Sequence, residues 1–275
     1  MNNLTNIKVT CFCSKHNRNY NLKYHYKKKP KNETKFNLNY KKYERFLFEC
    51  QNCNHIFSKH KYDLTTLYSN DYLVYTYKNT ENIYKKFLSI MSLPKNKSDN
   101  KNRVLRINSF IKKNNFKNRN LLDIGAGIGV FGKSMQLRGW NVSTVETNKT
   151  LVNYLNKLNL NSYLINKSNK FKLHGKKFDL IVLNKILEHV EKPISYLNYI
   201  KKFLNNNGVI YIEVPDVNAT KLGKSREEFY IEHYHIFSKN SLDILLKKNN
   251  LKSLQMKSIV EPSGKFTLFT FCVKY

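Results

Sequence analysis

Short apolar runs alternate with segments of helical periodicity over most of the chain, from about residue 119 to its end. The runs have the length of buried strands, and the segments between them repeat apolar residues three and four positions apart. This alternation predicts an α/β fold, a mostly parallel seven-stranded sheet with helices on both faces. Strands are expected at 121–124, 142–146, 163–165, 178–183, 209–214, 254–260 and 266–273, and helices at 130–138, 151–158, 193–204 and 238–246.

Two more segments upstream of this region have the apolar spacing of helices, one around residues 84–91 and one over 102–113. These helices either cover a cofactor cleft or only pack on the edge of the sheet. The pattern divides the chain into a small module at residues 1–70, a helical linker or lid at 71–118, and a main domain at 119–275.

The chain is strongly basic, with a formal net charge of +30 at pH 7. Such a charge is typical of proteins that bind nucleic acid or acidic surfaces. The lysines are spread over strands, helices and loops without a single block, so we attribute the charge to composition and rank nucleic acid below a small-molecule partner.

The N-terminus has neither the basic start nor the apolar run of a secretory signal. No stretch approaches the roughly 18 apolar residues that a membrane helix needs. We therefore expect a cytoplasmic protein with no membrane span, in which cysteines are thiols or metal ligands and not disulfides.

Two pairs of cysteines near the N-terminus, Cys11 with Cys13 and Cys50 with Cys53, are candidate metal ligands. Four thiolates suit tetrahedral zinc, which a small module with little apolar core needs for stability. The second pair has the spacing of a zinc knuckle, whereas the first is one residue short and leaves His16 as an alternative ligand. The sequence predicts a zinc-ribbon-like module with a structural zinc ion. The alternative is a set of ordinary buried cysteines.

A predicted strand ends at three alternating glycines, Gly125, Gly127 and Gly129, which lead into a helix. Together with Gly132 the last two match the dinucleotide pattern Gly-x-Gly-x-x-Gly, and Glu146 ends the next strand, where a ribose would be held. By this pattern alone the turn would bind a dinucleotide.

The second register of the same turn begins with Asp123, two residues ahead of Gly125. A carboxylate there would repel a pyrophosphate across a short distance. Negative potential instead suits an ammonium and a sulfonium, while the glycines let the backbone approach the ligand. The charge therefore favours S-adenosylmethionine as the cofactor.

Several separated motifs in a fixed order resemble the class I S-adenosylmethionine-dependent methyltransferases, over about residues 119 to 273. The resemblance implies a Rossmann-like sheet in which the turn from Asp123 to Gly129 cradles the methionine and ribose end of the cofactor. It also implies that Glu146 binds the ribose hydroxyls and that residues around Asn184 close over the methionine part. Residues 166–168 include no acidic residue for the adenine amine. The motifs are residues 122–129, Glu146, 178–183 with 187–190, and 208–215.

A narrower resemblance, to the branch that includes sugar C-methyltransferases, rests on the zinc-ribbon-like front, the Asn-Asp-Tyr at 70–72 and residues 229–238. In that branch the Tyr-x-Glu-His segment lines the acceptor site. The chain ends without the further C-terminal domain of that branch, so transfer to oxygen or nitrogen is open beside transfer to carbon. The residues carried over as candidate acceptor-site and catalytic residues are Tyr230, Glu232, His233 and His189, with Tyr72 a candidate lid residue.

Chemistry gives an independent reason to consider these histidines. Methyl transfer is an in-line displacement, so much of the acceleration comes from holding nucleophile and methyl group in line. A base that removes the acceptor's proton adds about 10²- to 10⁴-fold, and histidine suits this role near neutral pH. Glu232 is placed to orient a ring or to contact a sugar hydroxyl. In the alternative interpretation this segment, with His235, only packs against the helix that begins at Ser238.

Three functions follow from these patterns. The first is methyl transfer to a small molecule, in particular a nucleotide-linked sugar in surface-glycan or secondary-metabolite synthesis. The second is an RNA or protein methyltransferase, which the charge favours although the sequence has no basic-aromatic stripe. The third is a non-catalytic nucleotide- or metal-binding protein.

Overall fold

A computed structural model provides the structure of the chain. It describes residues 11–13, 19–33, 43–62, 64, 80–114, 116, 118–166, 170–173 and 175–275. The α-helices are α2 (Thr80–Ser92), α3 (Asp99–Lys113), α4 (Val130–Gln136), α5 (Lys149–Lys157), α6 (Pro193–Ile200) and α7 (Lys239–Lys247). The strands are β1 (Tyr20–Tyr26), β2 (Arg45–Cys50), β3 (Ile56–His60), β4 (Asn120–Ile124), β5 (Asn141–Glu146), β6 (Asn161–Leu164), β7 (Phe178–Asn184), β8 (Leu204–Pro215), β9 (His235–Ile236), β10 (Leu251–Val260) and β11 (Phe266–Lys274).

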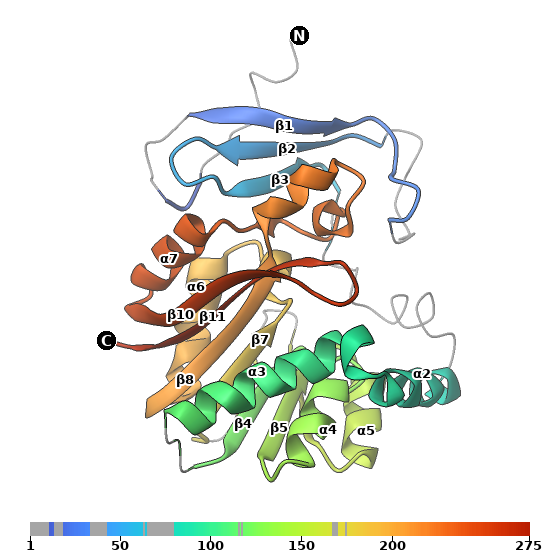
Figure 1. The fold of residues 1–275 in the computed structure, drawn as a ribbon, viewed down its shortest axis with the longest axis vertical. Helices are drawn as coiled ribbons and strands as arrows, with labels where there is room; N and C mark the ends of the chain where they lie inside the picture. The colour runs from blue at the N-terminus through green and yellow to red at the C-terminus, as the bar shows by residue number, and fades with distance from the viewer. Residues whose placement is uncertain are drawn as a thin grey trace.

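The main sheet has seven strands in the order β10-β11-β8-β7-β4-β5-β6, as Figure 1 shows in part. The pairs from β8 to β6 are parallel, and β11 is antiparallel to both β8 and β10. The predicted α/β fold with a mostly parallel seven-stranded sheet is therefore confirmed.

Helices cover both faces of this sheet because its strands are apolar on both sides. Neighbouring residues of β4 illustrate this: Leu121 packs in the core with α2 to α5, and Leu122 packs in the core with α6 and α7. Side chains of a strand alternate between faces, so a continuous apolar run supplies two cores at once.

The helix expected over 193–204 is shorter than predicted. Helix α6 ends at Ile200, a 3₁₀ turn, η4 (Lys201–Phe203), follows, and Leu204 is the first residue of β8. Leu204 is buried where it pairs with Phe178 of β7, so its apolar side chain belongs to the sheet and not to the helix.

The two upstream helices are present, and α3 lies on a face of the sheet instead of its edge. The Phe110 ring of α3 stacks on Phe271 of β11 with centroids 3.9 Å apart. On the same helix, the buried Arg103 and the partly buried Arg106 donate to the carboxylate of Glu213 in β8. The candidate lid residue Tyr72 lies outside the described residues.

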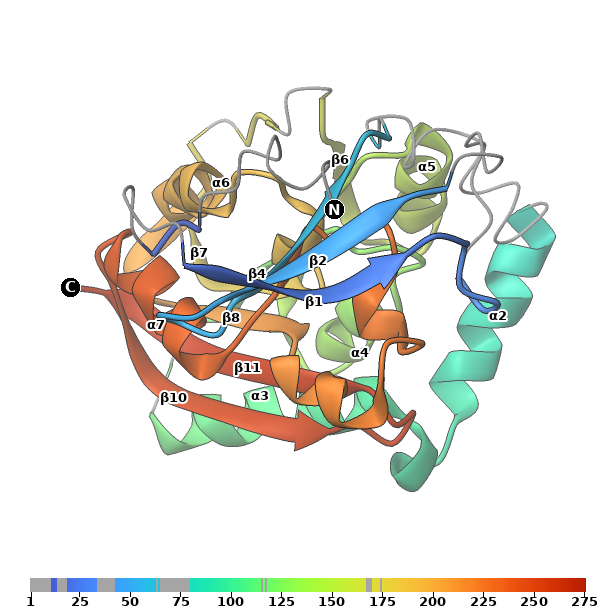
Figure 2. The same ribbon diagram turned by 90° about the horizontal axis from the view of Figure 1, so that it is seen from above.

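The N-terminal segments form a second sheet, in the order β1-β2-β3-β9. Its last strand comes from the segment after β8: Ile56 pairs with Ile236 and Phe57 with His235. We call β1, β2, β3 and the cysteine turns beside them the ribbon module. Figures 1 and 2 show it lying across the end of the main sheet where β8 stops, over the segments that follow that strand. The proposed division at residues 70 and 118 stays a prediction.

Within the part of the chain that the structure describes, no helix is both long enough and apolar enough to cross a membrane.

Candidate functional site

The glycine turn joins β4 to α4 beside the carboxyl end of β5. The Gly125 amide donates to the Val145 carbonyl of β5 at 2.8 Å, and a Cβ on Gly125 would clash with the Ile186 side chain. Gly127 has φ 55°, in the left-handed region, and a Cβ on it would meet no described heavy atom within 4 Å. Gly125 thus serves packing, while the backbone at Gly127 borders open space that a ligand can approach.

The structure gives less support to the dinucleotide pattern formed by Gly127, Gly129 and Gly132. Its third glycine, Gly132, lies inside α4, where a Cβ would meet Leu160, Asp123 and Thr144 at 3.4 to 3.5 Å. These are close to ordinary contact distances. In the dinucleotide pattern the third glycine allows the helix to pack closely on the strand, and Gly132 shows no such close packing.

Glu146, at the end of β5, is bound to the glycine turn. Its Oε2 accepts from the Gly127 amide at 2.9 Å, and its Oε1 accepts from the amide and hydroxyl of Thr147 at 2.6 and 2.9 Å. These bonds hold the carboxylate beside the open side of Gly127. A ribose in this space would find the carboxylate in reach of its hydroxyls.

Asp123 lies beneath the turn and not on its open side. Its side chain is buried, and Oδ2 has no hydrogen-bond partner among the described residues. Burial raises the pKa of this carboxyl to about 7, although the positive charge of Arg103 works against the shift. A cation bound above the turn would favour the ionised form, so Asp123 can contribute negative potential without direct contact.

The end of β7 brings Asn184 and Lys185 to the same edge of the sheet. The Asn184 Oδ1 is buried without a hydrogen-bond partner among the residues described, so it is available to a ligand group. Lys185 has φ 57°, unusual for a residue with a side chain, and its amide donates to the Glu213 carbonyl at 2.9 Å. Backbone strain of this kind is common at binding sites.

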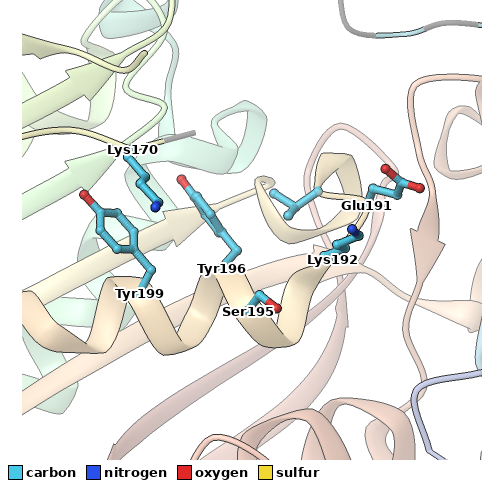
Figure 3. Close-up of a pocket in the computed structure, with 7 residues that line it drawn as sticks. Lys170, Glu191, Lys192, Ser195, Tyr196 and Tyr199 are labelled. Carbon is cyan, nitrogen blue, oxygen red and sulfur yellow. The ribbon is translucent and has the colours of Figure 1, made fainter. Parts of the chain in front are cut away.

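A pocket of about 290 Å³ lies beside α6 (Figure 3). Tyr196 and Tyr199 project into it from the helix and Lys170 comes from the opposite side. It is lined by Lys170, Val190, Glu191, Lys192, Ser195, Tyr196 and Tyr199.

The structure brings two of the predicted site histidines together. The rings of His189, in the 3₁₀ turn η3 (Leu187–His189), and His233 are 4.7 Å apart in an edge-to-face arrangement. The Nδ1 atom of His189 lies 2.9 Å from the Glu232 carbonyl, and that of His233 lies 2.9 Å from the Glu228 carbonyl. The Tyr234 amide donates to the Glu188 carbonyl at 2.7 Å, which ties this segment to η3.

Both histidines are neutral at pH 7. Burial lowers the pKa of His189 to about 4 and holds that of His233 well below its usual value. Because a carbonyl can only accept, each Nδ1 carries the proton and each Nε2 carries the lone pair. The pair therefore carries no positive charge, and Nε2 of His233 holds a lone pair.

Tyr230 and Glu232 lie on the same segment as His233. Both are within electrostatic range of Glu33, and Glu232 is also in range of Arg45, two residues of the N-terminal region. Burial raises the pKa of Glu232 to about 7. The assignment of both residues to the acceptor site stays a prediction.

The ribbon module holds the predicted acceptor segment through a buried ion pair. Arg45 Nη1 donates to the Phe229 carbonyl, and Glu33 Oε1 accepts from the Ile231 amide at 2.7 Å. The Arg45 and Glu33 side chains lie 3.3 Å apart, both fully buried. At the other end of the segment, Ser238 Oγ donates to the Cys53 carbonyl.

Replacing Glu33 by glutamine is expected to lower the free energy of unfolding by about 3 to 5 kcal/mol, because Arg45 would stay buried with its charge uncompensated. Chemical denaturation measures this change. The matched control is Glu81→Gln in an exposed pair with Lys85, which should unfold like the unmodified protein. Equal stability of the Glu33 variant and the control would show that the ion pair does not hold the segment.

The four N-terminal cysteines converge on one point. The Sγ atoms of Cys11 and Cys53 are 3.5 Å apart, as are those of Cys13 and Cys50, and all four lie within 4.8 Å of one another. Tetrahedral zinc with bonds of about 2.3 Å would place thiolates about 3.8 Å apart. The four thiols therefore fit such an ion, and the alternative ligand His16 lies outside the described residues.

Several residues of this site were not found from the sequence. Glu188 and Lys185 adjoin the predicted residues His189 and Asn184, yet only Glu188 had a signal, its place beside His189 in the quoted motif. Arg45 and Glu33 had none, because charged residues are common throughout the chain and burial is not visible in composition.

Comparison with known proteins places this site in a family. A family model described as "Methyltransferase domain" matches residues 96–256, more than half of the chain. The ubiquinone biosynthesis O-methyltransferase of Rickettsia bellii (strain OSU 85-389) is 22% identical over 177 residues, which cover 57% of this chain and 73% of the relative.

Solved structures share the fold at low sequence identity. The magnesium protoporphyrin IX methyltransferase of Synechocystis PCC 6803, solved with bound SAH, has a TM-score of 0.58 and 11% identity, covering 78% of this chain and all of its own. A methyltransferase from Clostridium acetobutylicum ATCC 824 has a TM-score of 0.53 and 15% identity, with coverages of 70% and 98%.

The family match agrees with the second register of the glycine turn and leaves the dinucleotide and non-catalytic interpretations without support. It covers the turn, the strand that ends at Glu146 and the His189–His233 pair. The chain belongs to the methyltransferase-domain family and is an S-adenosylmethionine-dependent methyltransferase of class I.

Proposed function

We propose that this methyltransferase acts on a hydroxyl group of an anionic small molecule bound beside the His189–His233 pair. The observation that carries the proposal is the pair itself, two neutral imidazoles with their Nδ1 atoms held by backbone carbonyls. S-adenosylmethionine supplies a methyl group on a positively charged sulfur. The chain's own residues then have to hold the acceptor in line and accept its proton.

Three groups would hold the cofactor. Glu146 is placed for the ribose hydroxyls, Gly127 offers open backbone, and the Asn184 Oδ1 lacks a partner among the described residues. Asp123 beneath the turn would add negative potential for a positively charged ligand. These assignments stay proposals until binding is measured.

His233 is the proposed acceptor of the proton. Its Nδ1 donates to a carbonyl, so Nε2 can accept from a hydroxyl without a change of tautomer. A pKa far below the usual value makes it a weak base in the resting protein. Charge that develops on a hydroxyl losing its proton would favour the protonated ring during the reaction.

A nucleotide-linked sugar is the proposed acceptor. Lys170 and Lys192 line the pocket beside α6, which suits a phosphate-bearing molecule, and the net charge of +30 favours anionic ligands in general. The name of the Rickettsia relative supports oxygen as the methylated atom.

A screen for labelled product tests the proposal. The intact protein is incubated with methyl-labelled S-adenosylmethionine and with nucleotide-linked sugars, phenolic hydroxyl compounds or total RNA. Label in a nucleotide-linked sugar is expected. Label in a phenol would keep hydroxyl methylation and replace the acceptor class, whereas label only in RNA would overturn the small-molecule proposal.

We also propose that Cys11, Cys13, Cys50 and Cys53 hold a structural zinc ion, on the evidence of their convergence. The ion would fix the two turns at one end of the ribbon module. Since Cys53 also accepts from Ser238, zinc would stabilise the attachment of the acceptor segment.

Replacing Cys50 by serine should reduce zinc by one equivalent per chain and lower the melting temperature, because three thiolates bind zinc less tightly than four. Elemental analysis and thermal unfolding measure the two effects. The control is Cys272→Ala, which removes a buried thiol of β11 outside the cluster and should keep the zinc. Unchanged zinc in the Cys50 variant would contradict the assignment.

A further inference from the structure

Helix α6 begins without a side-chain cap at the pocket beside it. Its N-cap residue is Lys192, whose side chain makes no capping hydrogen bond, and Pro193 follows in the first turn. The Tyr196 amide donates to the Lys192 carbonyl at 3.1 Å. Among the described residues, the amides of Ile194 and Ser195 have no such acceptor, as is usual for the first turn of an uncapped helix.

Free amides at the start of a helix favour an anion, because the amide dipoles point their positive ends outward there. Two lysines, Lys170 and Lys192, line the same pocket, and both are exposed. Figure 3 shows them on different sides of the pocket, with Ser195 at its floor in the first turn of α6. Backbone donors and positive charge therefore meet at one place.

A buried tyrosine adds a hydroxyl without a partner. The Tyr196 side chain is only 8% exposed and projects from α6 into the pocket (Figure 3). Its hydroxyl makes no hydrogen bond with any described residue. Burial raises the pKa of this hydroxyl well above its usual value, so it keeps its proton and can donate. Since buried polar groups are nearly always paired, the hydroxyl is available to a ligand oxygen.

The neighbouring tyrosine shows the contrast. The Tyr199 hydroxyl donates to the Phe171 carbonyl at 2.6 Å and accepts from the Phe171 amide at 3.0 Å. Its ring also packs edge-to-face against Phe171 and Phe203. Tyr199 thus forms a wall of the pocket, and Tyr196 is the tyrosine that offers a donor.

Two carboxylates oppose an anion here. Glu191 lines the pocket, although Figure 3 shows its carboxylate directed away from the two tyrosines. Glu146 is within electrostatic range of Tyr196, and its oxygens already accept from Gly127 and Thr147. Net charge at the pocket is therefore small, so an anion would be held chiefly by directed hydrogen bonds.

The pocket is continuous along the chain with the candidate acceptor site. Val190 and Glu191, which line it, directly follow His189. The Glu191 carbonyl also lies 3.3 Å from Nε2 of His235, a residue of the segment that contains His233. A molecule with one group in the pocket can therefore extend toward the histidine pair.

We propose that the first turn of α6 binds a phosphate group of the acceptor, with the amides of Ile194 and Ser195 and the Tyr196 hydroxyl donating to its oxygens. Lys170 and Lys192 would offset its charge. That the phosphate belongs to a nucleotide-linked sugar rests on the proposed function. The phosphate site itself rests on the free amides, the hydroxyl and the two lysines.

Calorimetry on the intact, unmodified protein at physiological salt tests the site with inorganic pyrophosphate. We expect one pyrophosphate per chain, displaced by uridine diphosphate and not by uridine. Absence of binding, or weak binding at many places, would overturn the proposal. If a short RNA displaces pyrophosphate and uridine diphosphate does not, nucleic acid is the source of the phosphate and the assignment to a nucleotide-linked sugar is wrong.

Replacing Tyr196 by phenylalanine keeps the ring and removes only the hydroxyl. Pyrophosphate affinity should fall about 10-fold, since hydrogen bonds to charged groups contribute more than those between neutral groups. The matched control is Tyr163→Phe in β6, whose hydroxyl accepts from Lys176 at 2.7 Å outside the pocket. Equal affinities of the two variants would remove Tyr196 from the site.

Replacing Lys192 by asparagine supplies the missing cap. An asparagine side chain at this position accepts from the amides that the phosphate needs, so pyrophosphate affinity should fall at least about 10-fold while the melting temperature rises. Lys252→Asn in β10 removes the same charge from an exposed position without capping a helix, and should change neither. Unchanged affinity in the Lys192 variant would overturn the proposal.

An amide spectrum of the unmodified protein covers the case in which a variant does not fold. In a ¹⁵N-labelled sample, pyrophosphate should shift the signals of Ile194 and Ser195 most. Shifts spread over the exposed lysines, with these two amides unmoved, would contradict the site.

Kinetics with methyl-labelled cofactor separates this proposal from the proposed function. With a nucleotide-linked sugar as acceptor, Tyr196→Phe should raise KM and leave kcat unchanged, because a remote phosphate contact is the same in the ground and transition states. An unchanged KM together with methylated product refutes only the phosphate site. Pyrophosphate bound at α6 without methylation of any nucleotide-linked sugar refutes only the proposed acceptor.

Discussion

Replacing His233 by asparagine is expected to lower kcat by about 10²- to 10⁴-fold and to leave S-adenosylmethionine binding unchanged. Asparagine can keep a hydrogen bond to the Glu228 carbonyl that now accepts from the ring, but it supplies no basic nitrogen. The loss is expected because Nε2 of His233 is the proposed acceptor of the proton. Steady-state kinetics with the acceptor from the screen measures kcat, and calorimetry measures cofactor affinity.

The control for this substitution is His25→Asn in the ribbon module. Its ring stacks on Phe46 and pairs with Glu44, in a different sheet from the proposed site, so turnover should be unchanged. If the His233 variant keeps full turnover while it binds the cofactor, the histidine pair is not the place where the acceptor reacts.

Replacing Glu146 by alanine is expected to weaken S-adenosylmethionine binding by about 10²-fold or more. The substitution removes the proposed acceptor of the two ribose hydroxyls, and hydrogen bonds to a charged group contribute about 1.5 to 3 kcal/mol each. It also leaves the Gly127 amide without the carboxylate oxygen that now accepts from it. Calorimetric titration measures the dissociation constant directly.

An exposed carboxylate provides the comparison for Glu146. Glu44→Ala removes one negative charge from the ribbon module and should leave the cofactor affinity as it was. If the Glu146 variant also binds with unchanged affinity, the ribose does not lie at the end of β5.

The main sheet was predictable because its signal is local. Each buried strand is a short apolar run, and the βα alternation fixes parallel neighbours on geometric grounds. The glycine turn was equally visible, since Gly125 and Gly127 have positive φ and glycine is the residue that adopts it readily. The ends of the elements were harder to predict. Leu204 continues the apolar period of the preceding helix α6, but the structure pairs it with Phe178 as the first residue of β8.

The attachment of the ribbon module could not be predicted in this way. Strand β9 has two residues, His235 and Ile236, too few to show a period, and its partner β3 lies some 180 positions earlier in the chain. The ion pair of Arg45 and Glu33 is hidden for another reason. In a chain with 49 lysines and arginines, nothing marks the one arginine that is buried against the acceptor segment.

The burial of Glu188 could not be predicted from the sequence either. The motif that contains it drew attention to His189, because a histidine suggests acid–base chemistry by itself. That the neighbouring carboxyl group is fully buried near Lys185 depends on how η3 packs under the segment around His233. This information exists only in three dimensions.

The identity of the ligand at the glycine turn is tested most directly by titrating the intact, unmodified protein with S-adenosylmethionine, and separately with NADH, in a calorimeter. The account predicts one S-adenosylmethionine bound per chain and no heat of binding with NADH. Binding of NADH without S-adenosylmethionine would show that the dinucleotide register of Gly127, Gly129 and Gly132 is the correct one, and would contradict the assignment of the turn to a methyl donor.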